Sequence, residues 1–266
     1  MNNLIAHKEP FHYYSVDDYI PTELFESFQE VCEQIPSFTF PIPYFKYNWT
    51  IFWSKSKGCF LRKTFGRSYW KYRKSKFAKL NKAKVDLPGT KFECLRLNLN
   101  KYITLQHHDI EDLVYKNLNE FANYSFDINL NVANKFGREY SSVDDLFLYC
   151  ELQVLNLHAD IQRHHHSNRV VSSVTYIHPQ ESNGTDFHLG KYNYNDMNIY
   201  FDDIPINFVM PWKQNSSVFF TDELHAFRSI ESEKRITINN WLVDANSENG
   251  KSLLQKYTWQ PTCNDI

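Results

Sequence analysis

Apolar and polar positions follow different periods in the two halves of this chain. In PTELFESFQEVCEQI, residues 21–35, apolar residues recur at intervals of three and four, and Pro21 and Thr22 provide a start signal, so we predict a helix. A second helix is predicted in HDIEDLVYKNLNEFANYS and a third around NVANKFGREY. FHYYSVDDYIP, near the N-terminus, is typical of a short strand followed by a turn.

From about Phe147 the chain changes to short segments rich in β-branched and aromatic residues, separated by turn-forming residues. These segments are LFLYCELQVLNLHAD, NRVVSSVTYIHP, GTDFHLG, NSSVFFT, HAFRSIE and RITINNWLV. Many short strands at close spacing indicate an antiparallel sandwich or barrel. We therefore predict a mainly β fold with flanking α-helices, in which N-terminal helices precede a β core.

Length and composition favour a single body. The chain has 266 residues and only 7 Gly, which leaves little flexible linker. We expect one domain over residues 1–266. Within it, residues 1–145 would form a helical and stranded support with a substrate lid, 146–245 the β core, and 246–266 a C-terminal tail.

Cysteine usage and hydropathy predict a cytoplasmic protein. The five Cys residues form no CxxC pair, which favours reduced thiols. The N-terminal sequence has no apolar run that suits a signal peptide, and no stretch approaches the length of a transmembrane helix. The formal net charge of −2 points to no class of partner, and neither composition nor charge predicts an oligomeric state.

One span is strongly basic. Residues 34–85 contain no acidic residue but thirteen Lys or Arg, which lie within 46–84 and are interleaved with aromatic residues. Clustered cations and stacking rings suit an anionic partner such as a nucleic acid. The alternative is a solvated helix face whose aromatic residues anchor it to the core.

Candidate metal ligands lie in LNLHADIQRHHHSNRVVSSVTYIHP, residues 155–179, which contains five His. His158 and Asp160 are two positions apart, so in an extended chain they share one side and can bind one ion. A second H-x-D, His107 and Asp109, directly precedes a predicted helix that Asp109 can cap, so we favour the later pair. The following run of three His, residues 164–166, is expected to form a loop that faces solvent or substrate.

A third ligand and an anion-binding pair are predicted further along the chain. His225 opens a strand after a turn, and Arg235 opens the next strand ten positions later. Alternation places Arg235, Thr237, Asn239 and Trp241 on one face, and Ile236 and Ile238 on the other. A buried Arg and Thr would be costly unless they meet an anion, and a dicarboxylate can accept two parallel hydrogen bonds from a guanidinium. Two His and one carboxylate form the facial arrangement of non-haem Fe(II) oxygenases, whereas structural zinc prefers four protein ligands.

The order of these motifs resembles a known family. H-x-D, then NRVVSSVTYIHP, GTDFH, SVFFTDELHAFRSI and RIT, resembles the Fe(II)/2-oxoglutarate dioxygenase superfamily, in particular its prolyl-4-hydroxylase-like branch. The match covers residues 150–243, and PFHYYSVDDYIPTELFESF resembles the strand-then-helix opening of that branch. The chain departs from the pattern at Gly184-Thr185, where the branch often has Gly-Gly, and at Ile177, where Leu is usual. The resemblance implies a double-stranded β-helix, a cupin-like jelly roll.

The resemblance also implies cofactors and roles. Fe(II) would be bound by His158, Asp160 and His225. Arg235 would pair with the distal carboxylate of 2-oxoglutarate, with Thr237 as a hydroxyl helper. The cofactors implied are Fe(II), 2-oxoglutarate and O2, and ascorbate is allowed.

Two further residues are candidates for cofactor contacts. Arg169 is placed like the strand Arg of the resembling branch, where it would meet substrate or cofactor, the alternative being a surface acid. Tyr149 precedes the motif on the same strand as His158 or on its neighbour. The expected activity is hydroxylation of a protein or peptide side chain or of a small molecule. The alternative is a jelly-roll binding module, metal-free or zinc-bearing, that lacks oxygenase turnover.

Overall fold

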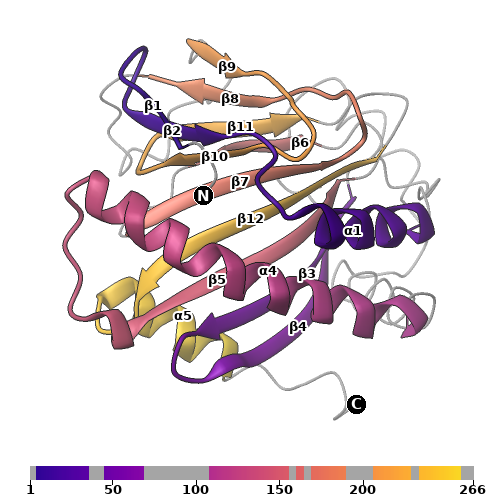
Figure 1. The fold of residues 1–266 in the computed structure, drawn as a ribbon, viewed down its shortest axis with the longest axis horizontal. Helices are drawn as coiled ribbons and strands as arrows, with labels where there is room; N and C mark the ends of the chain where they lie inside the picture. Colours follow the sequence, from indigo (N-terminus) through magenta and orange to yellow (C-terminus); the bar gives the residue numbers. More distant parts are fainter. Residues whose placement is uncertain are drawn as a thin grey trace, which may run out of the picture.

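The computed structural model of the protein describes residues 4–35, 45–68, 108–155, 160–164, 169–189, 206–228 and 234–258. Within these ranges, residues 45–47, 64–68, 108–109, 160–164, 227–228 and 258 are described by their backbone alone. Three α-helices and twelve β-strands lie in the described ranges (Figure 1). No helix among these residues is long and apolar enough to cross a membrane.

The helices are α1 (Thr22–Gln34), α4 (His108–Lys135) and α5 (Glu248–Thr258). The helix predicted over residues 21–35 is confirmed as α1, which buries Phe28, Val31 and Cys32. The prediction of two separate helices between His108 and Tyr140 is wrong, because α4 runs unbroken for 28 residues. It begins at His108, so Asp109 lies in its first turn and does not precede it as a cap.

The strands form two antiparallel sheets. The larger has the order β1-β2-β10-β7-β12-β5-β3-β4, and the smaller has the order β6-β11-β8-β9. The bounds in the larger sheet are Ile5–His7, Tyr13–Val16, Ser217–Phe220, Val171–His178, Arg235–Asp244, Leu146–Leu155, Phe45–Ser54 and Gly58–Ser68. Those in the smaller sheet are Asp160–His164, Leu224–Arg228, Thr185–His188 and Phe208–Met210.

The strands from β5 to β12 form a double-stranded β-helix. Along the chain β5, β7, β10 and β12 join the larger sheet, while β6, β8, β9 and β11 join the smaller one. This confirms the predicted jelly roll with N-terminal helices. The larger sheet is extended on one edge by β1 and β2 and on the other by the β3–β4 hairpin (Figure 1).

The described part of the basic span is this hairpin and not a helix, so the helix alternative is wrong for residues 45–68. Trp49 and Trp53 of β3 are buried in the main core and anchor the hairpin. Arg62 lies 5.4 Å from the ring centroid of Tyr115, and Lys55 is paired with Asp127 at 3.0 Å. These cations contact other parts of the protein. Residues 69–84 of the span lie outside the described residues.

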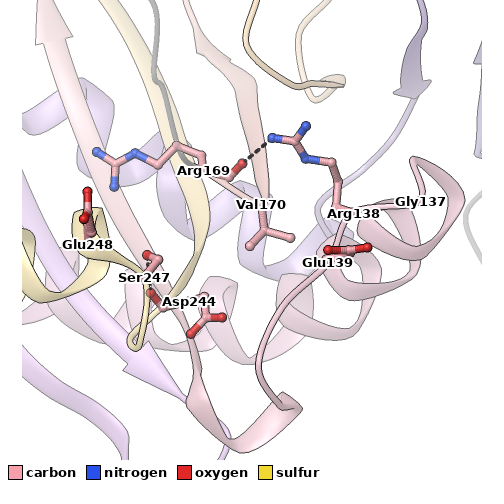
Figure 2. A pocket seen from close by; sticks show the side chains of 8 residues that line it. All are labelled: Gly137, Arg138, Glu139, Arg169, Val170, Asp244, Ser247 and Glu248. Atoms are coloured by element: carbon pink, nitrogen blue, oxygen red, sulfur yellow. Dashed lines mark hydrogen bonds between the residues drawn. The ribbon is translucent and has the colours of Figure 1, made fainter.

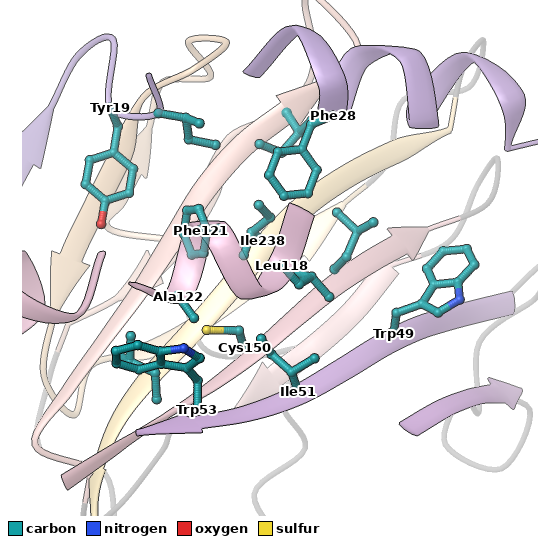
Figure 3. Packing of buried hydrophobic residues seen from close by; sticks show 14 of the residues in the cluster. Tyr19, Phe28, Trp49, Ile51, Trp53, Leu118, Phe121, Ala122, Cys150 and Ile238 are labelled. Atoms are coloured by element: carbon teal, nitrogen blue, oxygen red, sulfur yellow. The ribbon is translucent and has the colours of Figure 1, made fainter. Parts of the chain in front are cut away.

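The two faces of the larger sheet differ in chemistry. On the outer face, Cys150 of β5 and Ile238 of β12 pack with Phe28 of α1 and with Leu118 and Phe121 of α4 (Figure 3). Burial raises the pKa of the Cys150 thiol well above its usual range, so this thiol is inert at neutral pH. The outer face is therefore a dry helix-on-sheet core.

The inner face, which packs toward the smaller sheet, carries polar residues at the alternate positions. These are Asn48 and Thr50 of β3, Glu151 and Gln153 of β5, and Arg235, Thr237 and Asn239 of β12, all buried. Ile236 and Ile238 join the outer core, as alternation predicted. A buried polar surface of this extent is costly for folding alone, which marks the space between the sheets as the candidate site.

Candidate functional site

His225 lies near the start of β11, where its imidazole is held between the two sheets. The residue is 1% exposed, and its ring centroid lies 4.8 Å from that of Phe220 in β10 and 6.1 Å from that of Phe187 in β8. Its Nδ1 lies 2.8 Å from the carbonyl oxygen of Glu223. A carbonyl only accepts, so Nδ1 carries the proton and donates, and Nε2 carries the lone pair. Histidine ligands of metal ions usually have this arrangement.

Arg235, the first residue of β12, is fully buried at the inner face of the larger sheet. Its guanidinium carbon lies 5.1 Å from the ring centroid of Trp212 and 5.9 Å from that of Tyr176, and its Nε donates to the carbonyl oxygen of Asn183 at 3.4 Å. Burial lowers the pKa of Arg235 to about 10, so the side chain remains charged at neutral pH. The site therefore contains a desolvated cation between aromatic rings, which fits a bound carboxylate.

Hydroxyl groups lie beside this cation. The Tyr176 hydroxyl is 2.8 Å from Thr185 Oγ1, and burial raises the pKa of Tyr176 to about 12, so it stays protonated and can donate. Thr237 pairs with Tyr176 in the sheet register and contacts Asn239 Oδ1 at 3.4 Å. The sequence predicted one hydroxyl beside the cation, that of Thr237, and the structure adds those of Tyr176 and Thr185.

Three of these neighbours were missed from sequence. Tyr176 lies two positions along β7 from the apolar Val174, so its place on the inner face could have been found from alternation. Thr185 opens β8 at the position where the chain departs from the Gly-Gly pattern. Trp212 follows β9 in a turn-containing segment, where no periodicity indicates which way a side chain points.

Tyr149 and Arg169 belong to a second group at the other end of the larger sheet. Tyr149 pairs with Trp241 in the register, whereas Arg235 pairs with Leu155. Six positions of β12 separate Arg235 from Trp241, which corresponds to roughly 20 Å along a strand. The structure therefore brings Arg235 and Thr237 together and places Tyr149 and Arg169 apart from them.

This second group is aromatic and partly polar. Tyr149 stacks on Trp241 with a centroid distance of 4.8 Å, and its hydroxyl lies 2.9 Å from that of Tyr257 in α5. The guanidinium of Arg169 lies 5.8 Å from the Trp241 ring centroid. Burial lowers the pKa of Arg169, and within the described part of the chain its Nε and Nη1 are buried and have no hydrogen-bond partner.

Arg169 also lines a cavity of about 530 Å³ at this end of the sheet. Figure 2 shows the Arg169 side chain extending away from Arg138, which donates through Nη2 to the Arg169 carbonyl oxygen at 3.0 Å. Arg138 also pairs with Asp222 at 3.2 Å. The cavity thus contains two guanidinium groups, of which one is already paired with a carboxylate.

Between the two groups lies a buried carboxyl group that sequence reasoning did not name. Glu151 accepts from the Tyr149 hydroxyl at 3.1 Å and from Gln153 Nε2 at 2.8 Å. It pairs with Asn239 in the register, four positions from the level of Arg235. The inner face thus runs from a cation through amides and an acid to an aromatic cluster.

The remaining predicted metal ligands are placed only in part. His158 lies outside the described residues, as does His107 of the alternative pair, and Asp160 is described by its backbone at the start of β6. The prediction of a loop at His164 is wrong, because His164 is the last residue of β6, while His165 and His166 lie outside the described residues. Among the side chains that the structure describes, no three His, Cys, Asp or Glu form a metal-binding cluster.

Comparisons with known proteins give likenesses of fold. No family model and no curated protein matches the sequence. A prolyl-4-hydroxylase of Pseudomonas putida is 12% identical, with 87% of this chain and 91% of that chain covered and a TM-score of 0.36. A 2OG-Fe(II) oxygenase family oxidoreductase of Burkholderia pseudomallei is 11% identical, with 90% and 87% covered and a TM-score of 0.40. A prolyl hydroxylase of Trichoplax adhaerens is 12% identical, with 91% and 86% covered and a TM-score of 0.38.

Many of the solved structures similar to this chain are 2-oxoglutarate oxygenases. At such low identity the likeness concerns the fold and not the activity. Any functional conclusion must therefore rest on the side chains of this site.

Proposed function

We propose that the protein is an Fe(II)- and 2-oxoglutarate-dependent oxygenase that hydroxylates a peptide side chain or a small molecule. The observation that carries the proposal is the fully buried, charged Arg235 on the inner face of a double-stranded β-helix, ten positions after His225. A guanidinium in this environment favours an anionic ligand, because burial has removed the water that would otherwise solvate it.

The residues of this chain fit 2-oxoglutarate at one end of the site. Arg235 would bind the distal carboxylate through its guanidinium, and the hydroxyls of Tyr176, Thr185 and Thr237 can donate further hydrogen bonds. Trp212 covers the guanidinium and excludes water from that pair. Exclusion of water strengthens the attraction between the cation and the carboxylate.

The residues fit a metal ion at His225. Its Nδ1 is held by the Glu223 carbonyl oxygen, which orients Nε2 for a metal. His158 and Asp160 are the partners proposed from the sequence. Bound Fe(II), with 2-oxoglutarate and O2, would supply the oxidising chemistry, and the protein's own contribution is to bind, orient and exclude water.

The second group, at the Trp241 end, would meet the substrate. Arg169 lines the cavity of about 530 Å³, and its guanidinium also lies against the ring of Trp241, which is stacked on Tyr149. These side chains suit a substrate that carries both an apolar portion and an acceptor group. Oxygenase turnover would then take place between the anion-binding end and this end.

The proposal is tested by measuring succinate formed from 2-oxoglutarate with Fe(II) in air. Wild-type protein should form succinate, while His225→Ala, which removes a proposed metal ligand, and Arg235→Ala, which removes the buried cation, should form at least about 30-fold less; for Arg235, loss of one buried charged partner costs roughly 2–5 kcal/mol. Arg62→Ala is the matched control, since Arg62 is exposed and should leave turnover unchanged. Absence of succinate from the wild type, together with retained binding of 2-oxoglutarate, would favour the binding module instead.

A further inference from the structure

The inner face of the larger sheet carries two buried amide oxygens that can only accept a hydrogen bond. Within the described part of the chain, Gln153 Oε1 and Asn48 Oδ1 are buried and have no hydrogen-bond partner. The Gln153 residue is 2% exposed and Asn48 is fully buried, so bulk water does not solvate them. A buried acceptor without a donor destabilises the fold, and two of them at one place therefore point to a ligand that donates to both.

The sheet register places these two amide side chains next to each other. Asn48 of β3 lies directly opposite Gln153 of β5, and Gln153 in turn lies directly opposite Thr237 of β12. Directly opposite residues in an antiparallel pair have their Cβ atoms about 4.5–5.5 Å apart on the same face. The two amides therefore share the face of Thr237 and Arg235, beside the proposed 2-oxoglutarate site.

A buried carboxyl group lies in the same layer. Glu151 is two positions before Gln153 on β5, and Gln153 Nε2 donates to Glu151 Oε1 at 2.8 Å. This contact fixes the orientation of the Gln153 amide, because a carboxylate only accepts, so Oε1 is the Gln153 atom that faces a ligand. The Tyr149 hydroxyl donates to Glu151 Oε2 at 3.1 Å, and burial together with the charge of Glu151 raises the pKa of Tyr149, which keeps its proton. A carboxylate offers about four acceptor positions, so Glu151 can accept from a ligand in addition to these two donors.

We propose that Asn48, Glu151 and Gln153 bind a protonated primary amine of the substrate. An ammonium group has three donors and no acceptor, which matches two amide oxygens and one carboxylate. The charge of Glu151 favours a cation over a neutral donor, and the low dielectric between the sheets strengthens this attraction. The inference rests on the proposed function in placing the substrate between the two sheets, and it narrows the substrate class to a peptide or small molecule that carries a lysine-like amine.

The experiment compares two probes that differ in one charged group, Nα-acetyl-lysine methylamide and Nα-acetyl-norleucine methylamide. Their Kd values for the whole chain are measured by saturation-transfer-difference NMR without added Fe(II), so that no turnover consumes the probe. The lysine probe should bind the wild type at least about tenfold more tightly, the factor expected for a hydrogen bond to a charged group. Glu151→Gln and Gln153→Met should each remove this preference and leave binding of the norleucine probe unchanged. Gln29→Met is the matched control, because Gln29 Nε2 donates to the Ile177 carbonyl oxygen, a contact within the protein, and its loss should alter neither Kd.

The outcomes separate this inference from the proposed function. Equal affinity of the wild type for both probes, as expected if ordered water alone meets these oxygens, would overturn the amine site, while succinate formation by the same protein would leave the oxygenase proposal standing. A preference for the lysine probe that Glu151→Gln and Gln153→Met both retain would also overturn the amine site. A wild type that shows the preference, loses it in the variants and forms no succinate would uphold the amine site and contradict the oxygenase proposal. Circular dichroism checks the folding of each variant, and if neither variant folds, the wild-type comparison of the two probes decides alone.

Discussion

Replacing Arg235 with Met should have opposite effects on the free protein and on its ligand-bound form. Burial lowers the pKa of Arg235 from its ordinary 12.5 to about 10, which corresponds to roughly 3 kcal/mol of unfavourable charge burial at neutral pH. Because the pKa of Arg235 is lower in the folded state than in the unfolded state, its charge destabilises the fold at every pH below about 10. This destabilisation disappears only as the pH rises from about 10 toward 12.5.

Contacts of the guanidinium offset part of this cost. Stacking on Trp212 and Tyr176 contributes about 0.5–2 kcal/mol, and the long hydrogen bond to the Asn183 carbonyl oxygen about 1 kcal/mol or less. Methionine has a similar length, is apolar and adapts to irregular space. The free energy of unfolding of Arg235→Met without ligand should therefore equal that of the wild type or exceed it by up to about 2 kcal/mol.

Bound 2-oxoglutarate should make the wild type more stable than Arg235→Met. Wild-type protein in 2-oxoglutarate at 100 times the Kd gains about 2.7 kcal/mol of stability, and the variant should gain almost none at the same concentration. Urea unfolding at pH 7.5, with and without 2-oxoglutarate, measures both effects, and Arg62→Met is the control because Arg62 is exposed. A ligand-free Arg235→Met protein that is less stable than the wild type by 3 kcal/mol or more would refute the reasoning, since such a loss indicates a structural ion pair.

Three other changes test the fold. Phe28→Ala should lower the free energy of unfolding, measured in urea, by about 3–5 kcal/mol, because Phe28 of α1 is fully buried against the sheet. Phe60→Ala is the control and should cost less than about 1 kcal/mol, because Phe60 is 37% exposed. Gly184→Ala should cost several kcal/mol more than Gly58→Ala, because a Cβ at 184 would lie 1.5 Å from a backbone oxygen, whereas one at 58 has open space and meets only the strain of a positive φ of 63°, about 1–2 kcal/mol. Comparable thermal shifts would contradict this. Asp244→Asn should make the free energy of unfolding fall less steeply as the pH is lowered into the acid range. Burial alone would raise the Asp244 pKa, but hydrogen bonds from nearby backbone and hydroxyl groups lower it below its ordinary 3.8. The stability that Asp244 contributes is therefore present above pH 3.8 and lost as the pH falls through the folded pKa. An unchanged fall of stability in acid would refute this assignment.

Much of the β core could be predicted from local pattern. The alternation in RITINNWLV gave the two faces of β12 correctly, because Ile236 and Ile238 pack under the helices while Arg235 and Thr237 face the smaller sheet. A side-chain period of two is a local property of an extended chain, so residues far apart in the sequence are not needed to read it.

The β3–β4 hairpin was not predicted, although the sequence of β3 does alternate between the two faces of the sheet. Trp49, Ile51 and Trp53 alternate onto the main core, and Phe52 joins the aromatic cluster on the other face. Aromatic residues on both faces of β3 obscure the usual contrast between apolar and polar positions. Strands buried on both faces lack a clean alternation for this reason.

The pairing of histidines is the part that sequence could not supply. H-x-D at 158 and 160 and the His run at 164–166 are both compatible with a strand, and spacing alone does not say which faces His225. The choice depends on the register between β6 and β11, and that register includes a bulge. One extra residue in a strand exchanges the faces of all residues beyond it, so a local motif cannot fix which residues of β6 lie on the same face as His225.

The polar inner face of the larger sheet places the buried cation of Arg235 and the buried carboxyl group of Glu151 in one layer. Arg235 and Glu151 lie on neighbouring strands, separated by four register positions, which corresponds to roughly 13 Å. In the proposed function, a dicarboxylate bound at Arg235 would neutralise the buried cation at the end of β12 that lies away from Tyr149 and Trp241. Because Glu151 is held by Tyr149 and Gln153, its carboxyl group is tied to the aromatic end. A ligand that binds Arg235 in the folded state alone would therefore raise the free energy of unfolding of the whole domain.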